Sequence, residues 1–166
     1  MDVAAREAQP SPLVLRPFVL SDLPAVLAIE QVSSPSPWQG ELFLSELSKP
    51  YARVFVAELQ GQVIGYLCCW FVADEVQILN LAVHPRYRRH GVGRTLLQAV
   101  CNEARRAGAR CVSLEVRKSN IPARALYQRF LFRQVAVRPR YYADGEDALL
   151  LECDLAQLDF LDKKHP

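Results

Sequence analysis

The chain has 166 residues, of which 51% are hydrophobic and 23% are charged. These values are ordinary for one globular domain and exclude a fibrous or wholly disordered protein. The formal net charge of +2 is too small to predict nucleic-acid binding. No stretch has the roughly 20 consecutive apolar residues that span a bilayer. We therefore expect direct contact with neither nucleic acid nor membrane.

The five cysteines form no metal-binding or disulfide pattern. Their number is odd, Cys68 and Cys69 are adjacent, and none forms a CxxC or CxxH pair. We therefore expect buried, reduced thiols and no bound metal. Residues 1–12 lack the apolar segment of a secretory signal and are predicted to be a flexible tail. A cytoplasmic location follows by elimination.

Hydrophobic periodicity and turn residues divide the rest of the chain into regular elements. The first half is expected to contain a strand over 13–17, a helix capped by Ser21 and ending near Val32, a helix over 39–47, and strands over 53–59, 62–71 and 76–83. The second half is expected to contain a helix from Arg94 to Gly108, a strand over 111–116, a helix over 122–130, and strands over 135–138 and 148–154.

The order of these elements predicts the fold class. Gln60-Gly61 between two strands is a hairpin signal, and a third strand extends the meander. One strand–helix–strand crossover follows, so strands 76–83 and 111–116 should be parallel. The predicted class is α/β, or α+β in stricter terms, with a central mixed sheet. We expect one domain over residues 13–155 and a C-terminal tail over residues 156–166.

Residues 79–97, LNLAVHPRYRRHGVGRTLL, combine a buried strand, a basic stretch and two glycines at a helix start. The first N–H groups of a helix lack internal partners, and the helix dipole adds partial positive charge there. This junction predicts an anion cradle suited to a pyrophosphate. A Walker loop is excluded because the chain contains no Gly-Lys dipeptide. A dinucleotide fingerprint is excluded because Leu96 stands where its last glycine belongs.

Residues 88–93, RRHGVG, fit the pattern [QR]-x-x-G-x-[GA] directly after a strand ending in Leu-Ala-Val. This segment resembles the acetyl-CoA loop of the GCN5-related N-acetyltransferases, the GNAT family. Residues 113–132, SLEVRKSNIPARALYQRFLF, are similar to the next strand and helix of that family. Residues 140–148 and Pro37-Trp38 resemble the RimI-type ribosomal-protein alanine N-acetyltransferases. One departure is Leu131, which stands where the family usually has a glycine and predicts either a different helix cap or strain.

The resemblance implies the GNAT fold, a twisted, mostly antiparallel sheet with a β-α-β crossover that binds acetyl-CoA as cosubstrate. It assigns coenzyme contacts to Leu81, Ala82, Val83, Arg88, Arg89, His90, Gly91, Val92, Gly93, Arg94 and Asn120. The first three would offer backbone groups to pantetheine where two parallel strands separate. Asn120 equally fits an N-cap for the helix that follows.

Two residues are expected to carry the chemistry. Glu115 lies on a central strand, where partial desolvation would favour its role as general base. The alternative is a solvated strand charge or an ion pair with a nearby arginine. Tyr127 is the expected general acid for the leaving thiolate, although its apolar helical stripe also fits an ordinary core tyrosine.

The expected acceptor is a protein N-terminus, held between Pro37-Trp38 and Tyr141-Tyr142, although such aromatics also serve as loop anchors. An α-amine with a pKa of about 8 needs less help from a base than a lysine near 10.4. The leading hypothesis is acetylation of the N-terminal alanine of a small-subunit ribosomal protein, by direct attack in a ternary complex. The alternatives are an acetyltransferase for a small amine or lysine side chain, and a catalytically silent CoA-binding domain.

Overall fold

The computed structural model describes the backbone of residues 12–162 and the side chains of residues 12–158. The expected N-terminal tail therefore lies, apart from Pro12, outside the described residues. Seven strands form one sheet in the order β1-β2-β3-β4-β5-β7-β6. They are β1 (Val14–Pro17), β2 (Ala52–Leu59), β3 (Gln62–Val72), β4 (Glu75–Val83), β5 (Cys111–Arg117), β6 (Arg133–Arg138) and β7 (Ala148–Asp154). The predicted mixed α/β class is confirmed.

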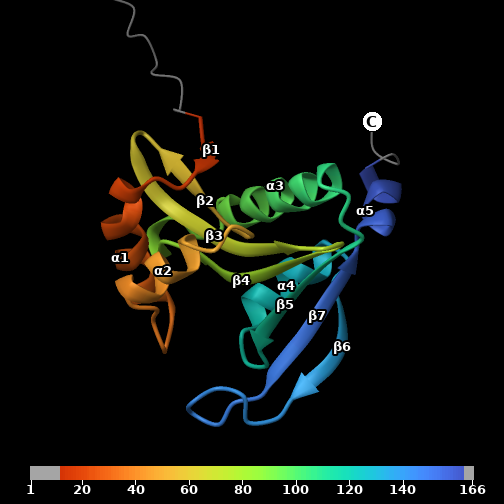
Figure 1. Ribbon diagram of the computed structural model, residues 1–166. Coiled ribbons are helices and arrows are strands. Elements are labelled where there is room, and N and C mark those ends of the chain that lie inside the picture. Colours follow the sequence, from red (N-terminus) through yellow and green to blue (C-terminus); the bar gives the residue numbers. More distant parts are fainter. Residues whose placement is uncertain (1–11, 163–166) are drawn as a thin grey trace, which may run out of the picture.

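The helices cover both faces of this sheet (Figure 1). They are η1 (Leu20–Asp22), α1 (Leu23–Ser33), α2 (Gly40–Leu47), η2 (Pro85–Tyr87), α3 (Val92–Arg106), α4 (Ile121–Arg129) and α5 (Leu155–Asp162). The larger core lies between the sheet and α3, α4 and α5, and a smaller core lies beneath α1 and α2. The apolar stripe predicted for the long helix is confirmed, because Leu96, Leu97, Val100, Cys101 and Ala104 of α3 are fully buried.

The first part of the sheet follows the local signals in the sequence. The expected hairpin forms, with Gln60 and Gly61 both at positive φ, at 51° and 78°, as a tight two-residue turn requires. The helix start differs from the prediction: Asp22, not Ser21, accepts the N–H of Val19 (2.8 Å) and precedes α1. Asp22 is also paired with Arg16 at 2.7 Å, which fixes the entry to α1.

Strands β4 and β5 form the one parallel pair among the described strands, as predicted, and they separate part-way along. Their pairing ends at Ile78 opposite Leu114, although β4 continues to Val83 and β5 to Arg117. A bulge at Leu79 accompanies the separation, because Ile78 and Asn80 oppose the successive residues Cys69 and Cys68 of β3. A bulge bends its strand away from its neighbour. The carboxyl ends of β4 and β5 therefore flank an opening in the sheet.

The segment expected to be a C-terminal tail is helical up to Asp162. Asp154 accepts the N–H of Ala156 at 2.9 Å, which caps the first turn of α5. Leu155 and Leu158 are 3% and 7% exposed and pack into the larger core. Their i, i+3 spacing after an aspartate is the local signal for this helix.

Leu131 adopts the conformation of the glycine that it replaces. Its φ is 60°, and α4 ends in a Schellman motif: Phe132 donates its N–H to the Tyr127 carbonyl (3.1 Å) and Leu131 to the Gln128 carbonyl (3.0 Å). The helix cap is thus the usual one. The strain that the sequence predicted as one of two outcomes is therefore present, and Tyr127 keeps the placement that a glycine cap would give it.

The strain at Leu131 predicts a difference in stability between two variants at this position. Leu131→Gly should be more stable than Leu131→Ala by about 1 kcal/mol, because both variants lose the side chain and only glycine relieves the left-handed backbone. The exposed Ala125 in α4 is the control: Ala125→Gly should be destabilising by about 1 kcal/mol. Urea unfolding of the four proteins measures both differences. Equal stabilities of the two Leu131 variants would show that position 131 is unstrained.

The buried thiols and the buried Tyr66 hydroxyl predict a loss of stability at alkaline pH. Burial raises the pKa of Cys68 and of Cys153 to about 12 each and raises the pKa of Tyr66 well above its usual range. The unfolded chain therefore releases these protons first as pH rises above about 8.5 to 10. Stability is fully present below that window and falls through it.

Thermal unfolding between pH 7 and pH 11 under reducing conditions tests this expectation. We expect a constant Tm up to about pH 8 and a steady fall above about pH 9. The fall should be shallower in Cys68→Ala, which removes one of the buried thiols. A Tm that stays level through pH 11 would contradict the assigned burial of these groups.

Candidate active site

The segment between β4 and α3 presents a run of unpartnered backbone donors. Within the described residues, no oxygen accepts a hydrogen bond from the N–H groups of residues 89–94. Arg89 and Gly91 have φ angles of 65° and 79°, and Gly91 directly precedes α3. The first bond into the helix is donated by Thr95 to the Gly91 carbonyl, at 2.9 Å. Such a concave run of N–H groups at a helix start suits a phosphate or pyrophosphate.

The arginines of this segment differ in what they contact. Arg88 donates from Nε to the Val83 carbonyl (3.0 Å) and from Nη2 to Ser33 Oγ (3.1 Å), so its side chain joins the end of β4 to the end of α1. Arg89 and Arg94 are exposed and form no ion pair within the described residues. These two guanidinium groups are free to meet an anion. Arg88 therefore has a structural role: it holds the start of this segment against β4 and α1.

The open edge of β4 faces the gap between β4 and β5. His84 donates its N–H to the Ile64 carbonyl of β3 at 2.8 Å. Because successive residues of a strand direct their backbone groups to opposite sides, Leu81 and Val83 direct theirs toward the gap, whereas Ala82 faces β3. The expected pantetheine edge therefore consists of Leu81 and Val83, and the small, buried Ala82 belongs to the smaller core.

Glu115 lies on β5 beyond the point where the two strands separate, and its side chain is 17% exposed. Its Oε1 is 2.9 Å from Arg138 Nε of β6. The Arg138 guanidinium carbon also lies 5.8 Å from the ring centroid of Tyr141, and the nearby Glu115 carboxylate raises the pKa of Tyr141. The structure thus brings the expected base together with one residue of the expected acceptor wall. It also realises the alternative of an arginine partner, because Arg138 pairs with Glu115.

Tyr127 is buried in the larger core, with its ring 5.6 Å from that of Phe132. Burial, with a smaller contribution from the neighbouring Tyr142, raises the pKa of Tyr127 well above its usual value. Its hydroxyl therefore stays protonated at neutral pH. Within the described residues this hydroxyl has no hydrogen-bond partner, so its proton is not committed to another group of the protein.

Arg117 holds the loop between β6 and β7 against the end of β5. Its guanidinium carbon lies 3.9 Å from the ring centroid of Tyr142. Its Nη1 also contacts Asp144 at 2.8 Å and Glu146 at 3.6 Å. Burial raises the pKa of Tyr142 to about 12. Tyr142 is thus fixed by a cation–π contact, whereas the more exposed Tyr141 lies near Arg138, the partner of Glu115.

Two expected contact residues have structural partners of their own. Asn120 accepts the N–H of Ala123 at 3.3 Å and caps α4, as its alternative assignment predicted. Trp38 packs its ring 5.1 Å from that of Phe43 and donates its N–H to Glu30 at 3.0 Å. No hydrogen bond or ring contact joins Pro37-Trp38 to Tyr141-Tyr142 in the described part of the chain. The acceptor slot between these two pairs therefore stays a prediction.

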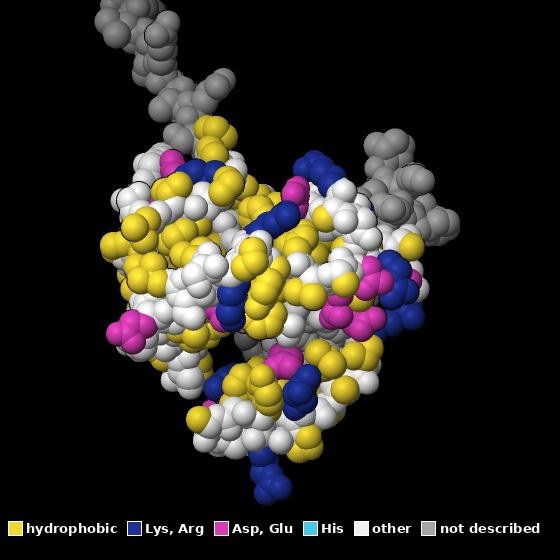
Figure 2. Space-filling view, in the orientation of Figure 1, with side chains coloured by type: hydrophobic (Ala, Val, Ile, Leu, Met, Phe, Trp, Pro, Cys, Tyr) yellow, Lys and Arg dark blue, Asp and Glu magenta, His cyan; other side chains and the backbone are white. Residues whose placement is uncertain are grey.

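The space-filling view shows a hollow between the body of the molecule and the β6–β7 hairpin, bordered by charged and hydrophobic side chains (Figure 2). In the ribbon view, the α1–α2 and β6–β7 loops both lie at the lower left, on the side toward which the carboxyl ends of β4 and β5 point (Figure 1). Among residues 12–158, no three His, Cys, Asp or Glu side chains are grouped to hold a metal ion. No helix of the described chain is long and apolar enough to cross a bilayer.

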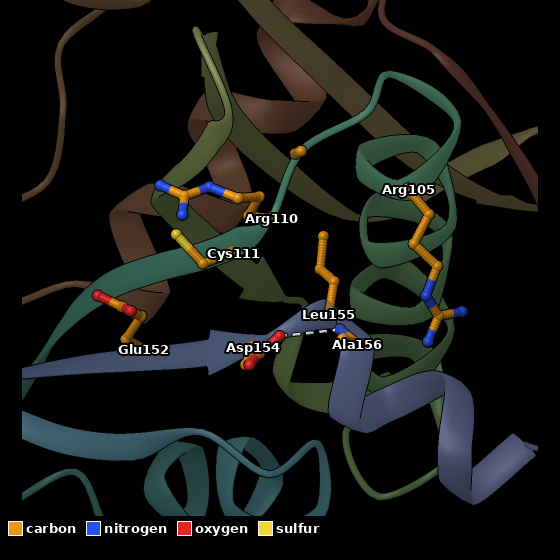
Figure 3. Close-up of a pocket in the computed structure, with 8 residues that line it drawn as sticks. Arg105, Arg110, Cys111, Glu152, Asp154, Leu155 and Ala156 are labelled. Carbon is orange, nitrogen blue, oxygen red and sulfur yellow. Dashed lines mark hydrogen bonds between the residues drawn. The ribbon is translucent and has the colours of Figure 1, made fainter.

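A second opening, with a volume of about 510 Å³, lies at the amino end of β5 (Figure 3). Its lining includes Arg110, Cys111, Glu152 and Asp154. Arg110 is paired with Asp74, and Asp154 caps α5. None of the expected site residues lines this pocket.

Comparisons with known proteins agree with this geometry. Residues 23–132 match the model of the acetyltransferase (GNAT) family. The chain belongs to the GNAT family. It is an N-acetyltransferase by this membership and by the names of its relatives, and the resemblance seen in its motifs is confirmed.

Two relatives and one solved structure that are named for the same activity align with most of the chain. The bS18-alanine N-acetyltransferase of Escherichia coli K12 is 37% identical over 134 residues, which is 79% of this chain and 90% of that protein. A Bacillus subtilis 168 protein provisionally named for the same activity is 41% identical over 139 residues, 82% of this chain and 92% of that protein. The E. coli S18-alanine N-acetyltransferase crystal structure superposes with a TM-score of 0.81 at 33% identity, covering 87% and 94% of the two chains.

Proposed function

We propose that this GNAT enzyme transfers an acetyl group from acetyl-CoA to the N-terminal α-amine of ribosomal protein bS18, at an alanine. The observation that carries the proposal is the position of Glu115 at the β4–β5 gap, where Arg138 pairs with its carboxylate at 2.9 Å and lies 5.8 Å from the Tyr141 ring. These contacts join a carboxylate at the gap to the loop expected to receive the acceptor. The two relatives named for bS18-alanine acetylation, at 41% and 37% identity, support the choice of acceptor.

The donor side fits acetyl-CoA. The unpartnered N–H groups of residues 89–94 would donate hydrogen bonds to its pyrophosphate, with Arg89 and Arg94 adding positive charge. The pantetheine would lie along the open edge of β4 at Leu81 and Val83, in the manner of an added strand. Bound in this way, the cosubstrate supplies a thioester as the acetyl source.

The chain's own groups would then manage the protons. Glu115 takes a proton from the incoming ammonium, which leaves a neutral amine to attack the thioester carbonyl. A backbone N–H at Leu81 or Val83 donates to the carbonyl oxygen as negative charge develops there. As the C–N bond forms and the C–S bond breaks, Tyr127 gives its hydroxyl proton to the departing sulfur. The nitrogen sheds its second proton as it becomes an amide; water carries that proton away and reprotonates Tyr127, and Glu115 returns its own proton to solvent.

One carboxylate suffices for an α-amine. The α-amine has a pKa of about 8 and the lysine side chain about 10.4, so at neutral pH roughly a tenth of α-amines are already neutral, and far fewer lysines are. A site with Glu115 as its one expected base therefore favours a protein terminus over a lysine. A ribosomal-protein acceptor also places the activity in the cytoplasm.

Recombinant, unacetylated bS18 is the direct test. After incubation with the enzyme and acetyl-CoA, tandem mass spectrometry should find one acetyl group on the N-terminal alanine and none on lysines. A bS18 whose first residue is blocked is the matched control and should stay unmodified. Modification of internal lysines, or acetylation of small amines with bS18 untouched, would overturn the proposal. CoA binding without turnover on any amine would identify a silent CoA-binding domain.

A further inference from the structure

Glu30 is a buried carboxylate that the reaction scheme does not use. It lies near the end of α1, is 1% exposed, and accepts three hydrogen bonds. Oε1 accepts the backbone N–H of Trp38 at 3.0 Å, and Oε2 accepts the side-chain amide of Asn80 at 3.0 Å and the hydroxyl of Tyr66. All three donors are neutral.

This carboxylate stands in an unfavourable place for a charge. Within the described residues Glu30 has no ion-pair partner, and the carboxyl end of a helix disfavours a negative charge. Buried carboxylates are normally paired with a cation. Glu46, the second buried carboxylate of the same region, is paired in that way: Lys49 lies 2.8 Å from its Oε1, and Trp70 donates its indole N–H to Oε2 at 2.7 Å.

The three donors to Glu30 come from elements on both sides of the expected reaction site. Trp38 belongs to the α1–α2 loop on the acceptor side. Asn80 follows the bulge of β4 and directly precedes Leu81, whose backbone faces the gap. Tyr66 lies on the adjacent strand β3, where it pairs with Ala82 of β4. One carboxylate therefore links the acceptor-side loop to the strand edge expected to hold the donor.

A second set of contacts keeps this region packed without Glu30. The Trp38 and Phe43 rings are 5.1 Å apart, and the Phe43 and Tyr66 rings are 5.5 Å apart. These ring contacts hold the Trp38 side chain in the smaller core. Loss of the carboxylate would consequently leave the loop attached by its ring but release its backbone.

We propose that Glu30 is a positioning residue that sets the acceptor-side loop relative to the donor edge of β4. The inference rests on the proposed function and on the expectation from the sequence that Pro37-Trp38 borders the acceptor. Glu30 touches neither substrate and acts through the Trp38 backbone and Asn80. Its replacement should impair use of the acceptor and spare the binding of acetyl-CoA, whose cradle lies at residues 89–94.

The test compares Glu30→Gln with Glu46→Gln, which removes the charge of the other buried glutamate. We expect the acceptor KM of Glu30→Gln to rise about tenfold or more, the effect of losing hydrogen bonds to a charged group. Its KM for acetyl-CoA should change by less than about twofold. Hydrogen exchange at the Trp38 amide should accelerate in Glu30→Gln alone. Glu46→Gln should leave both KM values and that amide unchanged.

An acceptor KM that rises no more in Glu30→Gln than in Glu46→Gln, or that rises together with the KM for acetyl-CoA, would overturn the assignment. If Glu30→Gln does not fold, Asn80→Ala removes the link to β4 and should show the same selective rise. A wild-type enzyme that acetylates no protein N-terminus would instead overturn the proposed function. The KM comparison then uses the amine that the wild type accepts, so the two failures are distinguished.

Discussion

Replacing Glu115 by glutamine is expected to lower kcat/KM for an α-amine acceptor by about 10²- to 10⁴-fold. Glutamine keeps the shape of the side chain, but it cannot take the proton of the ammonium. The fold should persist, because Glu115 is partly exposed and β5 is held by β7 over its full length. Initial rates with an alanine-terminated peptide measure the loss.

Two controls separate proton transfer from structural damage. Glu152→Gln removes an exposed carboxylate from the neighbouring strand β7 and should leave the rate unchanged. The pH profile provides the second control: Glu115→Gln can use only acceptor amine that is already neutral, so its deficit relative to the wild type should shrink as pH rises toward the α-amine's pKa of about 8. A Glu115→Gln enzyme with the wild-type rate and profile would remove Glu115 from the mechanism.

Tyr127→Phe is expected to lower kcat on the order of 10²-fold with little change in the KM for acetyl-CoA. Burial keeps the pKa of Tyr127 raised, so the hydroxyl is protonated and able to supply the departing thiolate. Stability should be nearly unaffected, because the hydroxyl has no partner within the described residues and its removal leaves no buried group unsatisfied. Steady-state kinetics and urea unfolding of the variant test both statements.

Tyr51→Phe, at a more exposed tyrosine near the start of β2, is the matched control and should retain full activity. If Tyr127→Phe kept its kcat and raised only the KM for acetyl-CoA, the hydroxyl would bind the donor without acting as its acid. If both constants were unchanged, Tyr127 would be an ordinary core tyrosine, the alternative that its helical stripe allows.

Much of the fold was predictable because its signals are local. The stripe of α3, the Gln60-Gly61 turn and the parallel relation of β4 and β5 all follow from spacing along the chain. Helix α5 was missed although Asp154, Leu155 and Leu158 carry its signal, because a short segment at the end of a chain gives little periodicity. The bulge at Leu79 has no glycine to mark it, so the separation of the strands entered only through the family resemblance.

Parts of the site that lie within one continuous segment were predictable from the sequence. Contacts between segments that are distant in the sequence were not. The expected phosphate cradle over residues 89–94 is continuous in sequence, so its glycines and arginines predict it. The partners of Glu115 are Arg138 and Tyr141, more than 20 residues away on another strand and loop, and no local pattern pairs them. Glu30 gave no signal either, since a single glutamate near the end of a helix reads as a solvated charge.

The central claim, acetylation of a protein's α-amine, is tested most directly with two peptides. One begins with a free alanine and contains no lysine; the other has a blocked N-terminus and internal lysines. After incubation of each with the enzyme and acetyl-CoA, mass spectrometry should find an acetyl group on the first peptide alone. Acetylation of the second peptide alone would contradict the claim and move the acceptor to the lysine side chain.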